Sequence, residues 1–216
     1  MEIHKEILDT FPGLSVAEND IGPLSITEKS PRLSALRDEI ISLVQERYTL
    51  EQVKDEPLFR AYRDFFWKVG VDPTKTRPAS EALVRRILAG KPLPAINTAV
   101  DAYNLASIRT GIPLAAFDAD TLAGDLHMRF AEKGEEFLGI GMATPVMLHK
   151  NQVVLADGHE IVAIYPYRDS DATKITLATK KVHIVACGVP DVDRETVRAA
   201  CGLAAGYLEE YASGVR

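Results

Sequence analysis

Cysteine is scarce in this sequence, and so are the long apolar runs that mark membrane proteins. Two cysteines occur in 216 residues, Cys187 and Cys201, without a CxxC spacing or a nearby histidine, so neither a disulfide framework nor a zinc site is expected. No segment approaches the ~20 apolar residues of a membrane-spanning helix, and residues 1–13 lack the apolar core of a secretion signal. We therefore expect buried thiols, a cytoplasmic protein and no membrane partner.

The chain also lacks an excess of positive charge. Its net charge of −6 and isoelectric point near 5.4 argue against a protein that holds nucleic acid through its overall field, so no DNA partner is expected. Any RNA contact must be a local basic patch. Eight cations are candidates for such a patch: Lys75, Arg77, Arg85, Arg86, Lys91, Lys174, Lys180 and Lys181. The alternative is that these charges form an ordinary solvated surface.

Familiar catalytic motifs are missing as well. The sequence has no HExxH and no glycine-rich phosphate loop, and its five histidines lack metal-ligand spacing. Ser107 and Ser170 lack the flanking glycines of a nucleophile elbow. Asp118 and Asp120 form a DxD pair, but aspartates after a short strand commonly bond to backbone N–H groups. No metal and no cofactor are expected.

The apolar patterning indicates helices first, then strands, then a closing helix. Strands are predicted at 2–7 and 14–21, a helix from Ser30-Pro31 to about Tyr48, a short helix opened by Thr49 and Gln52, and a helix capped by Asp55 whose core stripe includes Trp67. Extended runs follow at 112–118, 125–131, 136–141, 152–156, 161–167, 173–178 and 181–187. Asp191 or Asp193 caps the last helix, to about Tyr211.

This order predicts an α+β fold with a mixed, largely antiparallel sheet flanked by helices. With 46% hydrophobic residues, the chain is long enough to bury a full core. Residues 1–74 are expected to form N-terminal strands and a helical subdomain packed on a main body of residues 75–216. We expect the two parts to form one compact unit.

The segment Arg77–Asn104, RPASEALVRRILAGKPLPAINTAVDAYN, is the most informative part of the chain. It predicts a helix opened at Pro78 and stopped at Gly90, then a rigid KPLP turn, then a second helix. Asn97 or Thr98 would cap that second helix, which carries Asp101 and Asn104 on one face. As a simple scaffold, the segment is two amphipathic helices with a solvated arginine pair and a capping asparagine.

The order of this segment and three later ones resembles a known family. The later segments are GIPLAAFDADTLAGDLHMRFAEKGEEF at 111–137, VVLADG at 153–158 and RDSDATKITLAT at 168–179. Together they resemble the editing, or tRNA-binding, domain of the phenylalanyl-tRNA synthetase beta subunit, here in a free-standing form, over residues 75–187. The resemblance implies that family's fold, a tRNA partner with an aminoacylated 3′ end, and hydrolysis of a mischarged ester.

Ester hydrolysis of this kind needs positioned groups more than a strong nucleophile. A pocket with N–H donors, amides or hydroxyls and one or two carboxylates can orient water. The predicted catalytic residues are Asn104, Asp101 and Asp169. The predicted substrate-binding residues are Asn97, Thr98, Glu135, Ser170, Asp171, Thr173 and Thr179, and the predicted RNA contacts are Arg85, Arg86 and Lys91. We expect the pocket residues to converge on one cavity. As structural residues, Asp169 and Ser170 would be turn formers and Glu135 would end a hairpin.

The chain departs from the family at two places. Ala115 stands where the family has a histidine before its Ala-Phe-Asp motif, so the imidazole is lost. RDSDAT replaces the glycine-rich segment whose glutamate recognises a tyrosine hydroxyl, with Asp169 or Asp171 as the nearest acidic counterpart. The resemblance therefore does not extend to selectivity for a tyrosyl ester.

Two other functions fit the same residues. One is a binding module without catalysis that holds a free amino acid or small metabolite, or docks tRNA without deacylating it; the lost histidine favours this module. The other is a protein-interaction domain in which residues 30–70 contact a partner.

Overall fold

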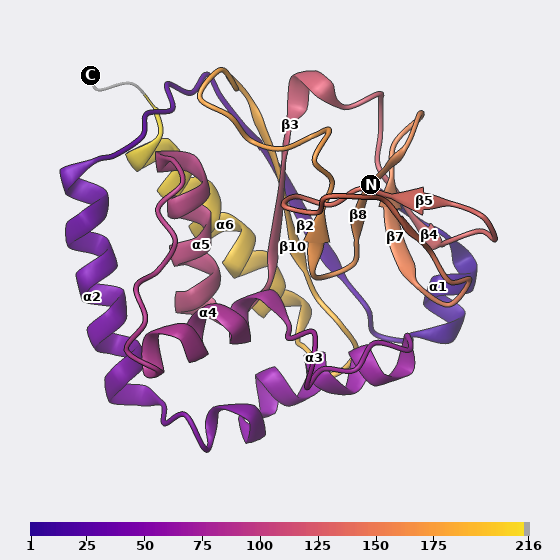
Figure 1. Ribbon diagram of the computed structural model, residues 1–216, viewed down its shortest axis with the longest axis horizontal. Helices are drawn as coiled ribbons and strands as arrows, with labels where there is room; N and C mark the ends of the chain where they lie inside the picture. The colour runs from indigo at the N-terminus through magenta and orange to yellow at the C-terminus, as the bar shows by residue number, and fades with distance from the viewer. Residues whose placement is uncertain (214–216) are drawn as a thin grey trace.

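The computed structural model describes residues 1–213 and confirms the α+β class (Figure 1). The α-helices are α1 Lys5–Thr10, α2 Pro31–Arg47, α3 Pro57–Lys68, α4 Ala79–Leu88, α5 Thr98–Thr110 and α6 Arg194–Tyr211, with 3-10 turns η1 Val53–Asp55 and η2 Ala119–Thr121. The strands are β1 Glu2–Ile3, β2 Val16–Ile21, β3 Leu114–Asp118, β4 His127–Phe130, β5 Glu136–Phe137, β6 Val146–Met147, β7 Val153–Ala156, β8 Ile161–Ile164, β9 Arg168–Asp169 and β10 Val182–Cys187.

The strands form two main sheets and a small hairpin. One sheet has the order β1-β4-β7-β8-β9 and the second β2-β10-β3, while β5 pairs with β6. All pairings are antiparallel except β1 with β4. Helices α5 and α6 cover one face of the β2-β10-β3 sheet, α2 lies outside them, and the five-stranded sheet lies on the other side of β3 (Figure 1). The two sheets therefore meet along β3 and β9.

The first thirty residues differ from the predicted pair of strands. Only Glu2–Ile3 and Val16–Ile21 form strands there, and Lys5–Thr10 forms α1 between them. Within this helix Ile7 is fully buried, and Phe11, which follows it, packs its ring 4.9 Å from that of Phe65. The alternation of apolar residues in 2–7 misled the prediction because one buried residue in a single helical turn leaves the same pattern as a short strand.

Helices α2 and α3 follow the predicted spacing, with two corrections. Ser30 caps α2 by accepting a hydrogen bond from Leu33 N at 3.5 Å. The predicted cap at Asp55 is wrong: Asp55 lies in η1, and α3 begins after Glu56 without a side-chain cap. Trp67 is also not in the core, since it is 58% exposed. It lies at the end of α3, beyond the stripe that the buried rings occupy.

The second half contains the predicted strands except one. Residues 173–178 form turns in place of an extended run. The hydroxyl of Thr179 accepts a hydrogen bond from Thr176 N at 3.0 Å. The same hydroxyl donates a hydrogen bond to the Asp118 carboxylate at 2.6 Å. Side chains that satisfy local backbone groups in this way compete with strand pairing.

One hydrophobic core joins both halves of the chain. A single cluster of buried residues extends from Ile7 to Ala212 and includes members on both sides of residue 74. A smaller cluster lies between the five-stranded sheet and the β5-β6 hairpin. Within residues 1–213, no helix is both long and apolar enough to cross a membrane.

Candidate functional site

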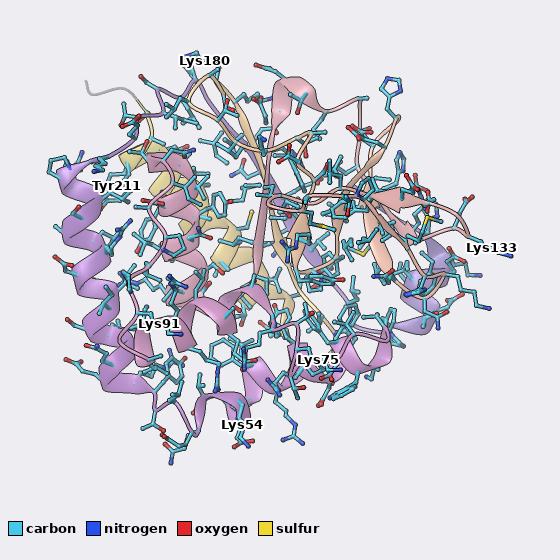
Figure 2. The ribbon with its side chains drawn as sticks, viewed as in Figure 1. Lys54, Lys75, Lys91, Lys133, Lys180 and Tyr211 are labelled. Carbon is cyan, nitrogen blue, oxygen red and sulfur yellow. The ribbon has the colours of Figure 1, made fainter. Side chains whose placement is uncertain are left out.

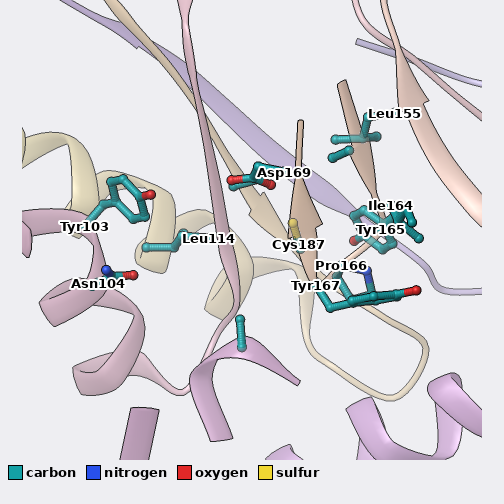
Figure 3. A pocket seen from close by; sticks show the side chains of 13 residues that line it. Tyr103, Asn104, Leu114, Leu155, Ile164, Tyr165, Pro166, Tyr167, Asp169 and Cys187 are labelled. Carbon is teal, nitrogen blue, oxygen red and sulfur yellow. The ribbon is translucent and has the colours of Figure 1, made fainter. Parts of the chain in front are cut away.

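A cavity of about 140 Å³ lies where the two sheets meet α5 (Figure 3). Its walls come from the start of α4, from α5, from β3, from β7 to β9 and from the end of β10. The residues that line it are Ala79, Tyr103, Asn104, Leu114, Ala115, Leu155, Ala163, Ile164, Tyr165, Pro166, Tyr167, Asp169 and Cys187. Most of these side chains are apolar or aromatic. The amide of Asn104 and the carboxylate of Asp169 are therefore the main polar groups that can orient a ligand by hydrogen bonding.

Helix α5 places Asn104 in the wall of the cavity. A capping residue and a glycine determine where this helix begins and ends. Asn97 caps the helix and accepts hydrogen bonds from Ala99 N at 3.1 Å and Val100 N at 2.9 Å. Gly111 ends it with a φ of 75°, a left-handed conformation that favours glycine. Asn97 is therefore the cap of α5, for which the sequence offered either Asn97 or Thr98.

Thr98, the other predicted cap, has a different role. Its hydroxyl accepts a hydrogen bond from Thr27 N at 3.1 Å, and its own N–H donates to Thr27 O at 2.8 Å. These two bonds hold the segment before α2 against the start of α5. Thr98 is buried, and neither bond faces the cavity, so in this structure its polar atoms serve the fold.

Asp169 is the ionisable group of the cavity. Its carboxylate accepts one long hydrogen bond, from Ala116 N at 3.4 Å, which links β9 to β3. Burial raises the pKa of Asp169 to about 7, and the bond from Ala116 and the charge of Arg168 oppose this rise. The guanidinium of Arg168 itself donates to Ile140 O. Near neutral pH, Asp169 can therefore both accept and release a proton.

Asp101 lies one turn before Asn104 but is committed to other partners. Its carboxylate accepts hydrogen bonds from Arg37 at 2.7 Å and from Ile96 N at 3.0 Å. Burial raises the pKa of Asp101, although both bonds act in the opposite direction. Asp101 thus joins α2, α5 and the linker before α5.

Glu135 lies on the turn between β4 and β5. Arg129 donates to both of its carboxylate oxygens, at 2.6 and 3.0 Å, and Glu132 N donates to one of them. The hydrogen bond from Arg129 lowers the pKa of Glu135. A paired carboxylate that closes a turn matches the structural interpretation of this residue.

The residues after Asp169 serve the turn that follows β9. Ser170 accepts a hydrogen bond from Ala172 N, and both oxygens of Asp171 bond to Lys174 at 2.9 Å. Thr173 is buried, and its hydroxyl has no partner within the described residues. Asp118 accepts from Asp120 N, the backbone role expected of the DxD pair.

The predicted pocket residues do not all line this cavity. Asn104 and Asp169 line one cavity. Six others are outside its lining in the chain up to residue 213: Asn97, Thr98, Asp101, Glu135, Asp171 and Thr179. Ser170 and Thr173 are likewise absent from its walls over these residues. Their substrate roles stay predictions, and the contacts above give seven of the eight, all but Thr173, a place in the fold.

Sequence reasoning missed the aromatic walls of the cavity. Tyr165 and Tyr167 flank Pro166 at the end of β8, and Tyr103 precedes Asn104 on α5. Tyr165 donates its hydroxyl to Gly188 O, which ties this corner to the end of β10. The YPY sequence after an apolar strand was a usable signal, because paired aromatics at a strand end often line pockets. Within residues 1–213 no group of three His, Cys, Asp or Glu side chains could hold a metal ion.

The predicted RNA-contact residues lie around an open groove beside α4. Arg86 and Lys91 are exposed, and Arg86 Nε donates to Pro92 O. Arg85 is half-buried and donates to Leu50 O at 3.2 Å, with Glu81 3.9 Å away. Arg85 is thus partly neutralised, while the other two present their charge to solvent.

Comparisons with known proteins agree on one family of relatives. The chain is 26% identical over 193 residues to the phenylalanine–tRNA ligase beta subunit of Latilactobacillus sakei, covering 87% of this chain and 20% of that protein. It is 30% identical over 161 residues to the same subunit of Fusobacterium nucleatum, covering 74% of this chain and 20% of that protein. The chain thus spans about a fifth of the length of these relatives.

A solved structure and a family model complete the comparison. An N-terminal fragment of the phenylalanyl-tRNA synthetase beta subunit from Pyrococcus horikoshii aligns with a TM-score of 0.47 and 14% identity, over 90% of this chain and 74% of that one. The model of the B3/4 domain matches residues 61–213. Because this match covers well over half of the sequence, the chain belongs to the B3/4 domain family.

Proposed function

We propose that this protein binds aminoacylated tRNA and hydrolyses a mischarged ester in the cavity between α5 and β9. The observation that carries the proposal is that Asn104 and Asp169 line one cavity whose other side chains are mostly apolar or aromatic. The relatives are named as tRNA ligase subunits, which supports tRNA as the partner. A cytoplasmic location accords with that partner.

The cavity has dimensions suited to an amino-acid side chain. Its volume of about 140 Å³ is close to that of engineered apolar cavities of ~150 Å³ that accept benzene. A side chain as large as one aromatic ring would enter, and Leu114, Leu155 and Ile164 would contact it. Discrimination by such walls is modest, about 10- to 200-fold per methylene.

Asp169 would act on the attacking water. With a pKa of about 7, its carboxylate is a competent general base at neutral pH. It accepts the proton of a water molecule as the water oxygen bonds to the ester carbonyl carbon. The Asn104 amide donates a hydrogen bond to the carbonyl oxygen as negative charge develops there. The ribose oxygen of the tRNA leaves with that proton, and the free amino acid remains.

The test is deacylation of a panel of mischarged tRNAs. We expect wild-type protein to release at least one amino acid, and Asp169→Asn and Asn104→Ala each to slow release by about 100-fold. Asp125→Asn, an exposed carboxylate outside the cavity, is the matched control and should retain the wild-type rate. Unchanged rates in both cavity variants would show that hydrolysis takes place elsewhere.

The second candidate function is a binding module without catalysis. Ala115, which replaces the family's histidine, lines the cavity itself, so the lost imidazole is a change inside the site. A module would bind a free amino acid and release nothing from any charged tRNA. Calorimetric titration with the amino acids, run beside the deacylation panel, separates the two functions.

A further inference from the structure

An open, basic groove lies beside α4 and the linker between α4 and α5. The groove has a volume of about 480 Å³. Its lining residues are Leu50, Arg77, Ala82, Leu83, Arg85, Arg86, Ala89, Lys91 and Pro94. A groove with four cations and no carboxylate in its lining differs from the rest of a chain whose net charge is −6. Figure 2 shows Lys91 on the side of the molecule opposite Lys133.

Three of these cations are available to a ligand. Arg77, Arg86 and Lys91 are exposed, and none lies within 4.0 Å of a carboxylate in residues 1–213. Other nearby charges are already paired, Lys75 with Asp72 and Arg85 with Glu81. The groove therefore concentrates free positive charge at one place.

A narrow crevice links the groove to the cavity, because it shares lining residues with both. Leu83 and Pro94 line both the groove and a narrow crevice of about 10 Å³, and Asn104 lines both that crevice and the cavity. Along α4, Ala79 belongs to the cavity and Arg86 to the groove, a separation of ~10 Å at the helical rise. The groove and the cavity are thus neighbours along α4.

The linker between α4 and α5 is hydrogen-bonded to both helices. Arg86 Nε donates to Pro92 O, and Lys91 N donates to Arg86 O. At its other end, Ile96 N donates to the Asp101 carboxylate. The linker, whose Lys91 and Pro94 line the groove, is therefore held at both ends.

We propose that the groove beside α4 binds the phosphodiester backbone of the single-stranded 3′ end of an RNA, with the linker at residues 91–97 guiding that end toward the cavity. This inference rests on the proposed function and adds the side from which the RNA would approach the cavity. Guanidinium and ammonium groups neutralise the phosphates, and Leu50, Leu83 and Pro94 offer apolar contact to a ribose or base. An acidic peptide could use the charges but gains little from this apolar floor.

The test measures binding of uncharged tRNA by fluorescence anisotropy at several salt concentrations. The triple variant Arg77→Gln, Arg86→Gln, Lys91→Gln should flatten the slope of log affinity against log salt by ~2 units, because each lost single-strand phosphate contact removes ~0.7. The control is Lys5→Gln, Lys133→Gln, Lys150→Gln, which changes the net charge equally at exposed sites outside the groove. The control should leave the slope within about 0.5 units of the wild type.

A trimmed RNA locates the contact on the ligand. Removing the four 3′-terminal nucleotides should weaken binding to the wild type by about tenfold and binding to the triple variant by less than twofold, because three phosphate contacts are already lost there. Equal losses for both proteins, a control that behaves like the triple variant, or poly-glutamate that binds the groove as tightly as RNA would each overturn the inference.

The two proposals fail separately. Deacylation that persists while the triple variant keeps wild-type RNA affinity would overturn the groove and leave the proposed function standing. RNA binding that depends on the groove, without release of any amino acid, would support the groove and remove hydrolysis.

Discussion

The carboxylate of Asp169 accepts a hydrogen bond from Ala116 N at 3.4 Å and so connects the two sheets of the protein. Ala116 lies on β3 of the three-stranded sheet, and Asp169 ends β9 of the five-stranded one. One long bond compensates little of the cost of burying a charge. Burial of this carboxyl group where the two sheets meet raises its pKa, and the bond from Ala116 opposes that rise only in part.

Deacylation should depend on pH through Asp169. If the ionised carboxylate is the base, the rate under single-turnover conditions rises with pH and levels off above an apparent pKa of about 7. At pH 5 about 1% of the group would be ionised, so the rate should fall about 100-fold from its plateau. The Asp169→Asn variant should show a flat profile over the same range. A wild-type profile that is also flat would remove Asp169 from the reaction.

The free energy of unfolding should also depend on pH through Asp169. It should fall as pH rises, whereas the deacylation rate should rise. The folded-state pKa of Asp169, about 7, lies above the ordinary value of 3.8, so between these values the folded state binds more protons than the unfolded state. The free energy of unfolding therefore falls as pH rises from about 4 to 7, by ~1.4 kcal/mol per unit at most. Replacement by Asn removes this dependence.

Urea denaturation at pH 5 and pH 8 checks the second effect. The stability of Asp169→Asn relative to the wild type should increase by about 2.5 kcal/mol between these values. The comparison of two proteins at each pH cancels the titration of other groups. A difference that stays constant with pH would mean that Asp169 ionises at its ordinary pKa.

The sequence predicted the elements better than it predicted their convergence. The Ser30 and Asn97 caps and the strand runs depend on local chemistry, which a sequence displays directly. The first strand, the Asp55 cap and the placement of Trp67 failed because one or two residues decided each of them. In each case tertiary packing overrode a weak local pattern.

The candidate site shows the same division more sharply. Asn104 and Asp169 were predicted for the same pocket because they belong to separate segments that resemble one family, and both line the cavity. Glu135 was grouped with them, yet Arg129 holds it on a turn outside the cavity lining. The sequence does not show whether a carboxylate is free or paired, since its partner is chosen by the fold.

The pair Arg37–Asp101 should contribute to stability as a coupled unit. Asp101→Asn keeps an acceptor for Ile96 N but leaves the Arg37 guanidinium, whose Nε is buried without a partner in residues 1–213, without its counter-charge. We expect a loss of about 2 kcal/mol, because an unpaired buried charge costs more than the pair contributes.

The double variant Arg37→Met, Asp101→Asn tests this coupling. It should recover at least half of the loss, since the uncompensated charge is gone. Urea denaturation of the two single variants and the double variant completes the cycle. Strictly additive losses would show that the two side chains do not interact.

Asn97 should matter for the stability of α5 and not for ligand affinity. Its amide accepts bonds from Ala99 N and Val100 N, so Asn97→Ala leaves two N–H groups without this acceptor and should cost about 1 kcal/mol, or ~3 °C in melting temperature. Ser30→Ala is the matched control, because its single bond to Leu33 N is longer, 3.5 Å, and its loss should cost less. Asn97→Asp retains an acceptor and should remain close to the wild type. RNA and amino-acid affinities measured well below the melting temperature should be unchanged in all three variants, and a selective loss of affinity in Asn97→Ala would return this residue to the binding site.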